Sequence, residues 1–102
     1  MYKKLARLNE IKEGLIKVVE TRYASIAITK VADKIIAFED VCTHDGESIS
    51  NGKLESGSIV CPRHFAKFEL VSGKALCMPA TEDLTLFEVR ISGEDIEVDI
   101  ED

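Results

Sequence analysis

The sequence predicts an all-β fold, a small antiparallel β sandwich or barrel-like fold built from many short strands. Three observations predict it. Short segments rich in Ile, Val and Ala are separated by turn-forming residues, apolar and charged residues alternate near the end of the chain, and helical periodicity is weak. The chain has 102 residues, of which 45% are hydrophobic, enough for one domain with a modest core. We therefore expect a single domain over residues 1–102.

The first half of the chain predicts three strands, over residues 14–20, 24–31 and 34–40, with a turn at Ala32-Asp33 between the last two. The preceding segment, KLARLNEIKEGLIKVV, has some apolar residues spaced by three or four. Gly14 interrupts this pattern and no capping residue opens it, so we favour strands there as well.

The end of the chain gives the clearest β pattern. Residues 85–91 place Phe87, Val89 and Ile91 in alternation with charged residues, and residues 95–101 repeat the pattern. Such alternation is typical of strands with one buried and one wet face, and Ser92-Gly93-Glu94 predicts the hairpin between them.

The central stretch, residues 42–58, differs from the strands around it because it is polar and rich in turns such as Asp-Gly, Asn-Gly and Ser-Gly. Long loops inside compact β domains are often functional. Both histidines and two of the three cysteines lie at its two ends: Cys42 and His44 open it, and Cys61 and His64 follow it.

Two pairs of cysteine and histidine predict a metal centre. Zinc binds four such ligands in a tetrahedron, so a structural zinc site is one interpretation. Each arm here holds one thiolate and one imidazole, as Cys-x-His and Cys-x-x-His, and sixteen residues separate His44 from Cys61. That arrangement also suits a centre with two unlike ends, such as a [2Fe–2S] cluster clamped between two loops.

The two arms, CTHDG and CPRH, resemble the cluster-binding loops of Rieske iron–sulfur proteins. The resemblance extends over about residues 2–100, includes Phe68, Gly73 and Pro79, and is greatest to the small ferredoxins of bacterial aromatic-ring dioxygenases. It implies a Rieske-type β sandwich with a cluster-binding subdomain formed by two loops, about residues 40–80, inserted in a β base. It also implies that Cys42 and Cys61 bind one iron and that His44 and His64 bind the other.

Neighbouring residues predict a low reduction potential within the Rieske range. High-potential Rieske proteins carry an extra cysteine in each loop, and the two form a disulfide, where this chain has Glu47 and Arg63. They also carry a serine and a tyrosine that donate hydrogen bonds at the cluster, where this chain has Ala66 and Phe68. Lost donors leave the added negative charge less stabilised, which lowers the potential.

Two other residues near the motifs have more than one interpretation. Many Rieske loops have glycine after the second histidine, where this chain has Phe65. We interpret Phe65 as packing into the β base, with shielding of the cluster as the alternative. Cys77 has no nearby partner in the sequence, so we interpret it as a buried thiol in a strand and not as a ligand.

The resemblance implies an electron carrier and not an enzyme, and no constellation for acid–base or nucleophilic catalysis remains once the histidines are assigned. The implied partners are a flavin-containing ferredoxin reductase and a terminal Rieske non-haem iron oxygenase, and a monomer fits this role. Two alternatives stay open: the small Rieske-like subunit of an assimilatory nitrite reductase, and a zinc-stapled β binding module.

Charge and hydropathy exclude other classes of protein. The net charge of −6 argues against a nucleic-acid binder. Residues 1–34 hold eight Lys or Arg against four Asp or Glu, and the rest hold five against fifteen. The acidic part is either a solvated surface or a face that steers a basic partner. With no apolar run that could span a bilayer and no signal-peptide pattern, we expect a cytoplasmic protein that does not bind membranes.

Overall fold

The computed structural model describes residues 1–22, 24–43, 46–62, 65–77 and 82–100, and for Cys77 it describes the backbone. These residues form eleven strands in three antiparallel sheets, which confirms the all-β prediction. The outer sheet has the order β1 (Tyr2–Arg7), β11 (Asp95–Asp99), β10 (Val89–Ser92). The central sheet has the order β2 (Ile16–Glu20), β3 (Ser25–Val31), β4 (Lys34–Glu39), β9 (Leu86–Phe87). The insert sheet has the order β5 (Lys53–Glu55), β6 (Ser58–Val60), β7 (Lys67–Glu69), β8 (Ala75–Cys77).

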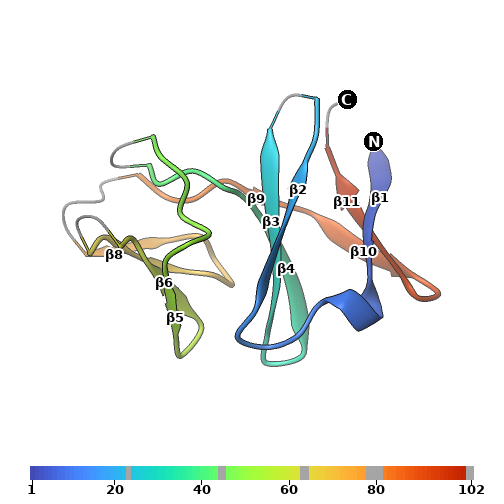
Figure 1. Cartoon of the computed structure of the whole chain (residues 1–102), viewed down its shortest axis with the longest axis horizontal. Coiled ribbons are helices and arrows are strands. Elements are labelled where there is room, and N and C mark those ends of the chain that lie inside the picture. Colours follow the sequence, from blue (N-terminus) through green and yellow to red (C-terminus); the bar gives the residue numbers. More distant parts are fainter. Residues whose placement is uncertain (23, 44–45, 63–64, 78–81, 101–102) are drawn as a thin grey trace.

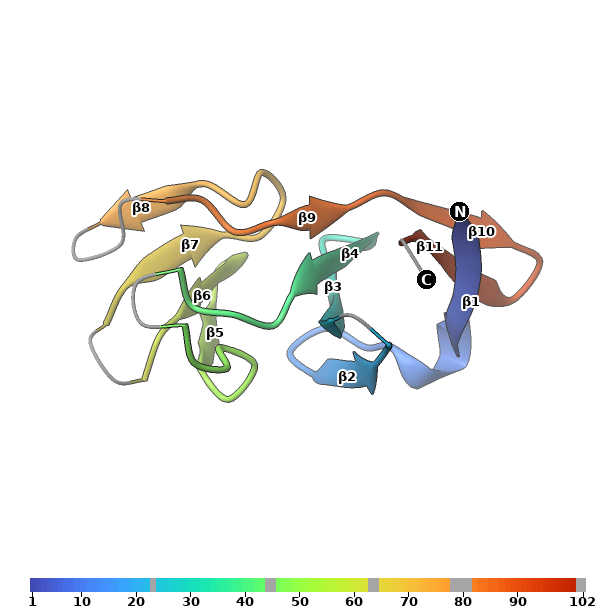
Figure 2. The same ribbon diagram turned by 90° about the horizontal axis from the view of Figure 1, so that it is seen from above.

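The insert sheet and the outer sheet lie at opposite ends of the molecule, with the central sheet between them (Figures 1 and 2). The insert sheet is formed by residues that lie between β4 and β9 in the sequence, and these two strands pair with each other through Ala37 and Phe87. The chain therefore leaves the central sheet at the end of β4, builds the insert sheet, and returns beside the strand it left.

The predicted strands of the first half occur close to their expected positions. β2, β3 and β4 match the expected segments, and Ala32 and Asp33 form the turn with left-handed φ values of 48° and 68°. The weak helical pattern before them yields only a 3₁₀ turn, η1 (Leu8–Glu10), which follows β1. Gly14 has a left-handed φ of 81°, a conformation that breaks a helix at that position.

The expected strand over residues 85–91 is two strands. β9 pairs with β4 in the central sheet, whereas β10 pairs with β11 in the outer sheet, and the break falls at Glu88. The reason is that the chain changes sheets at this residue, so its apolar side chains face different neighbours before and after it. Ile91 accordingly is 46% exposed, although Ile96 opposite it on β11 is fully buried.

Two hydrophobic cores use opposite faces of the central sheet. Ile26 and Ile28 pack with Ile96 and Val98 of the outer sheet. On the other face, the second core joins central and insert sheets and contains Ala27, Ile36, Phe38, Cys42, Ile49, Ile59, Cys61, Ala66, Phe68, Leu70 and Leu84. Burial on both faces explains why β3 and β4 read as nearly continuous apolar runs. Across the described ranges, the molecule has no helix of the length and apolar character that crossing a bilayer requires.

Candidate metal centre

The two predicted cysteine ligands lie in one hydrophobic core. Cys42 follows β4 after two residues, and Cys61 follows β6 directly. Both side chains are fully buried, and both are thiols rather than halves of a disulfide. A buried pair of thiols on two different loops is a donor set suited to a soft metal centre, because thiolate is the sulfur ligand of iron–sulfur clusters and of zinc.

The loops after the two cysteines have the same hydrogen-bonding pattern. In the first loop, the N–H of Cys42 donates to the carbonyl of Glu47 at 2.7 Å, and the N–H of Gly46 donates to the carbonyl of Cys42 at 2.8 Å. In the second loop, Cys61 donates to Ala66 at 2.7 Å, and Phe65 donates to Cys61 at 2.9 Å. Each cysteine thus closes a loop of the same size with its own backbone, so the two thiols are held in equivalent local settings.

Both predicted histidine ligands fall within these closed loops in the sequence but outside the described residues. His44 lies between Cys42 and Glu47, and His64 lies between Cys61 and Ala66. Asp45, Arg63 and Pro79 also lie outside the described residues, as does the side chain of Cys77, whose backbone belongs to β8. Among the residues that the structure does describe, no three His, Cys, Asp or Glu side chains converge on a common point.

The two positions at which high-potential Rieske proteins carry hydroxyl donors hold apolar residues in this chain. Ala66 and Phe68 are both fully buried in the core that holds Cys42 and Cys61. Ala66 also contacts the second cysteine through the backbone, because its carbonyl accepts the hydrogen bond from Cys61. The residues present therefore fit a cluster held by buried thiolates in an apolar setting.

The interpretation of Phe65 as packed into the β base is wrong, because 72% of this residue is exposed. Its backbone has a left-handed φ of 61°, and Gly46 occupies the equivalent position of the first loop with a φ of 76°. The closing hydrogen bond to the cysteine carbonyl requires this conformation in both loops, and in the second loop it leaves the aromatic ring at the surface. A bulky residue is strained in this region of φ, whereas glycine is not.

This equivalence predicts opposite effects on stability for two substitutions. Phe65→Gly should raise the free energy of unfolding by about 0.5–1 kcal/mol, and Gly46→Ala should lower it by about 1 kcal/mol. An alanine Cβ at Gly46 would meet no described residue within 4 Å, so we expect its cost to be conformational. Urea denaturation followed by circular dichroism measures both changes, and a destabilised Phe65→Gly variant would show that the ring stabilises the loop more than its backbone strains it.

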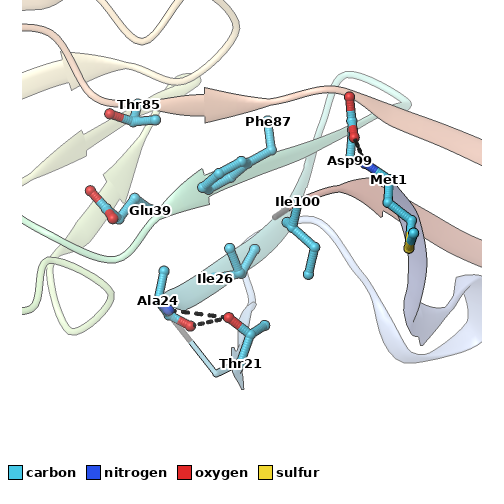
Figure 3. Close-up of a pocket in the computed structure, with 9 residues that line it drawn as sticks. All are labelled: Met1, Thr21, Ala24, Ile26, Glu39, Thr85, Phe87, Asp99 and Ile100. Carbon is cyan, nitrogen blue, oxygen red and sulfur yellow. Dashed lines mark hydrogen bonds and ion pairs between the residues drawn. The ribbon is translucent and has the colours of Figure 1, made fainter. Parts of the chain in front are cut away.

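A larger pocket lies away from the two loops. It has a volume of about 680 Å³ between the central and outer sheets, and Figure 3 shows Ile26, Phe87 and Ile100 lining it, with Glu39 at one end. The ammonium group of Met1 pairs with Asp99 at 2.6 Å on its border. Neither Cys42 nor Cys61 lines this pocket, whereas Cys61 with Pro62 and Phe65 lines a second pocket of about 460 Å³.

Comparisons with known proteins point to one family. The family model described as the Rieske [2Fe-2S] domain matches residues 1–88. The ferredoxin component of the naphthalene 1,2-dioxygenase system of Pseudomonas aeruginosa is 34% identical over 93 residues, which cover 91% of this chain and 89% of that protein. The ferredoxin subunit of 3-phenylpropionate/cinnamic acid dioxygenase of Shigella boydii serotype 4 (strain Sb227) is 45% identical over 76 residues, covering 74% of this chain and 72% of that protein.

A solved structure supports the same likeness. The complex of reduced oxygenase and oxidized ferredoxin in carbazole 1,9a-dioxygenase contains a chain that superposes with a TM-score of 0.88 at 32% identity, covering 95% of this chain and 91% of that one. The match to the family model, over residues 1–88, includes both loops.

Proposed function

Because this chain belongs to the Rieske [2Fe-2S] domain family and carries the [2Fe–2S] cluster of that family, we propose that the two matched loops hold the cluster. Cys42 and Cys61 bind one iron, and His44 and His64 bind the other. The observation that carries this proposal is the identical hydrogen-bond closure of the two loops around buried thiols. The cluster, when bound, supplies reversible transfer of one electron.

The protein is an electron carrier, as its curated ferredoxin relatives are, and not an enzyme. We propose that it receives single electrons from a flavin-containing ferredoxin reductase and passes them to a terminal Rieske non-haem iron oxygenase. The solved complex of a similar ferredoxin with its oxygenase supports the second partner. The protein acts as a single-domain monomer in the cytoplasm, and the charged residues Asp45, Glu47, Arg63 and Lys67 orient its partners.

The buried neighbours of the thiols support a low potential. The side chains of Ala66 and Phe68 hold no hydroxyl that could donate a hydrogen bond to reduced sulfur, and both residues are fully buried beside the cysteines. Rieske centres span roughly −150 to +300 mV according to such hydrogen bonds and to burial. We place this protein near the bottom of that range.

The two alternative functions, a zinc-stapled module and a nitrite reductase subunit, have less support. A structural zinc site is disfavoured, because the family's cofactor is a [2Fe–2S] cluster. A nitrite reductase small subunit shares the fold, but the curated relatives described above are a ferredoxin component and a ferredoxin subunit of dioxygenases. The carrier function therefore has the stronger support.

A spectroscopic and electrochemical experiment tests the proposed function. Protein made with ample iron and sulfide should be red-brown, and after reduction with dithionite its electron paramagnetic resonance spectrum should show a low average g value, the signature of nitrogen ligands on a two-iron centre. The midpoint potential should lie below about +100 mV. Reduced protein should also be reoxidised rapidly by a dioxygenase-type terminal oxygenase. Colourless protein with zinc and no labile sulfide would contradict the proposal.

A further inference from the structure

Asp40 is a buried carboxylate next to the first loop. It lies between the end of β4 and Cys42, and only 8% of the residue is exposed. Its Oδ1 accepts hydrogen bonds from the N–H groups of Ile49 at 2.9 Å and of Ser50 at 2.6 Å. Its Oδ2 accepts hydrogen bonds from the hydroxyls of Ser48 and Ser50, each at 2.8 Å. Both oxygens act as acceptors, which is the pattern of an ionised carboxylate.

These four hydrogen bonds join the two sides of the first loop. Asp40 precedes Cys42, and residues 48–50 follow Glu47, whose carbonyl closes the loop onto the cysteine. Ile49 is fully buried in the same core as Cys42 and Cys61, so the far side of the loop is also anchored. The carboxylate therefore fixes the base of the loop from which Cys42 projects.

Among the residues that the structure describes, the donors to Asp40 are neutral, so they stabilise its charge and offset it only in part. Burial keeps solvent from screening this charge, and an ion in a medium of low polarity acts over a longer distance than it does in water. Reduction of a nearby centre adds one negative charge. A fixed carboxylate two residues before the proposed ligand Cys42 disfavours the reduced state more than the oxidised state, and so lowers the reduction potential.

We propose that Asp40 is a positioning residue with a second effect: it holds the Cys42 loop in place, and its buried charge lowers the reduction potential of the cluster. This inference rests on the proposed function, in which Cys42 is a ligand. It adds a source of the low potential that is separate from the missing hydroxyls at Ala66 and Phe68.

Two variants separate the charge from the positioning. Asp40→Asn keeps the shape, its amide oxygen still accepts from the N–H groups of Ile49 and Ser50, and its amide nitrogen donates to the serine hydroxyls. It removes only the charge, so the midpoint potential should rise. The double variant Ser48→Ala/Ser50→Ala keeps the charge and removes two of its donors, so the potential should fall. Loosening of the loop alone would shift both variants in the same direction.

Glu39→Gln is the matched control, because it removes one negative charge from the preceding residue. Strand alternation turns Glu39 to the opposite side, where Figure 3 shows it at the pocket between the central and outer sheets. Its shift in potential should be smaller than that of Asp40→Asn. Protein-film voltammetry gives the potentials, and iron content and electron paramagnetic resonance establish that each variant holds the cluster.

The outcomes are distinct. The inference is supported if the midpoint potential rises in Asp40→Asn and does not rise in the double variant. The inference is overturned if the midpoint potential does not rise in Asp40→Asn, if it rises in both variants, or if it rises equally in Glu39→Gln. If Asp40→Asn takes up no cluster, the test depends on the double variant. Only a fall in its midpoint potential then supports the inference. Wild-type protein without a [2Fe–2S] cluster would instead refute the proposed function, which distinguishes the two failures.

Discussion

Replacing Cys42 or Cys61 with alanine should leave less than about a tenth of the wild-type iron and labile sulfide bound to the protein. Residues that only support a metal ligand already cost about 10- to 100-fold in metal affinity when they are lost, and a direct thiolate ligand contributes more. Each single variant should be as defective as the double variant, because one missing thiolate leaves the iron incompletely coordinated. Absorbance in the visible range, iron content and acid-labile sulfide measure the effect.

The third cysteine provides the control for this result. Cys77→Ala should keep the colour, the iron and the electron paramagnetic resonance spectrum, since it lies on β8 and is not among the proposed ligands. The loops themselves should survive in the Cys42 variant, because the hydrogen bonds that close them use backbone atoms. Far-ultraviolet circular dichroism of this variant should therefore remain that of a β protein. Loss of the cluster in Cys77→Ala with retention in Cys42→Ala would reverse the ligand assignment.

The [2Fe–2S] cofactor could be predicted because the proposed ligands lie close together in the sequence. Each cysteine is two or three residues from a histidine, so the donor types and their spacing are visible without any knowledge of the fold. The strands of the first half were equally predictable, since β3 and β4 are buried on both faces and are therefore mostly apolar, apart from the buried Thr29 on β3. Features that depend on neighbouring residues could therefore be predicted from the local sequence pattern.

Features that depend on distant partners were not predictable. Nothing in residues 85–91 indicates that β9 pairs with β4 and that β10 pairs with β11. The change of sheet at Glu88 therefore could not be predicted from the sequence. Asp40 looked like the end of a strand, because the serines that surround its carboxylate come eight and ten residues later. The exposure of Phe65 depends on a backbone conformation that its residue type disfavours, so the sequence indicated packing instead.

Gly52→Ala should cause the largest loss of stability among single substitutions around the loops, about 3 kcal/mol in the free energy of unfolding. A Cβ at this position would lie 2.2 Å from the carbonyl oxygen of Val60 and 3.0 Å from that of Ile49. Both neighbours are backbone atoms. Val60 is held on β6 by pairing with Lys53 and Lys67, so its carbonyl group cannot move away without breaking sheet structure.

The position of this contact links its effect to the metal centre. Ile49 belongs to the segment that Asp40 holds, and Val60 directly precedes Cys61, so Gly52 lies where the supports of the two loops meet. An alanine there forces them apart, and cluster content should fall together with the midpoint of urea denaturation. Gly46→Ala is the matched control, because it strains φ without a clash against any described residue. Since the cost at Gly52 is steric and involves rigid atoms, it should exceed that at Gly46 about threefold. Equal losses in the two variants would mean that the backbones of β6 and the preceding turn separate easily, and that the close contact at Gly52 does not set the spacing of the loops.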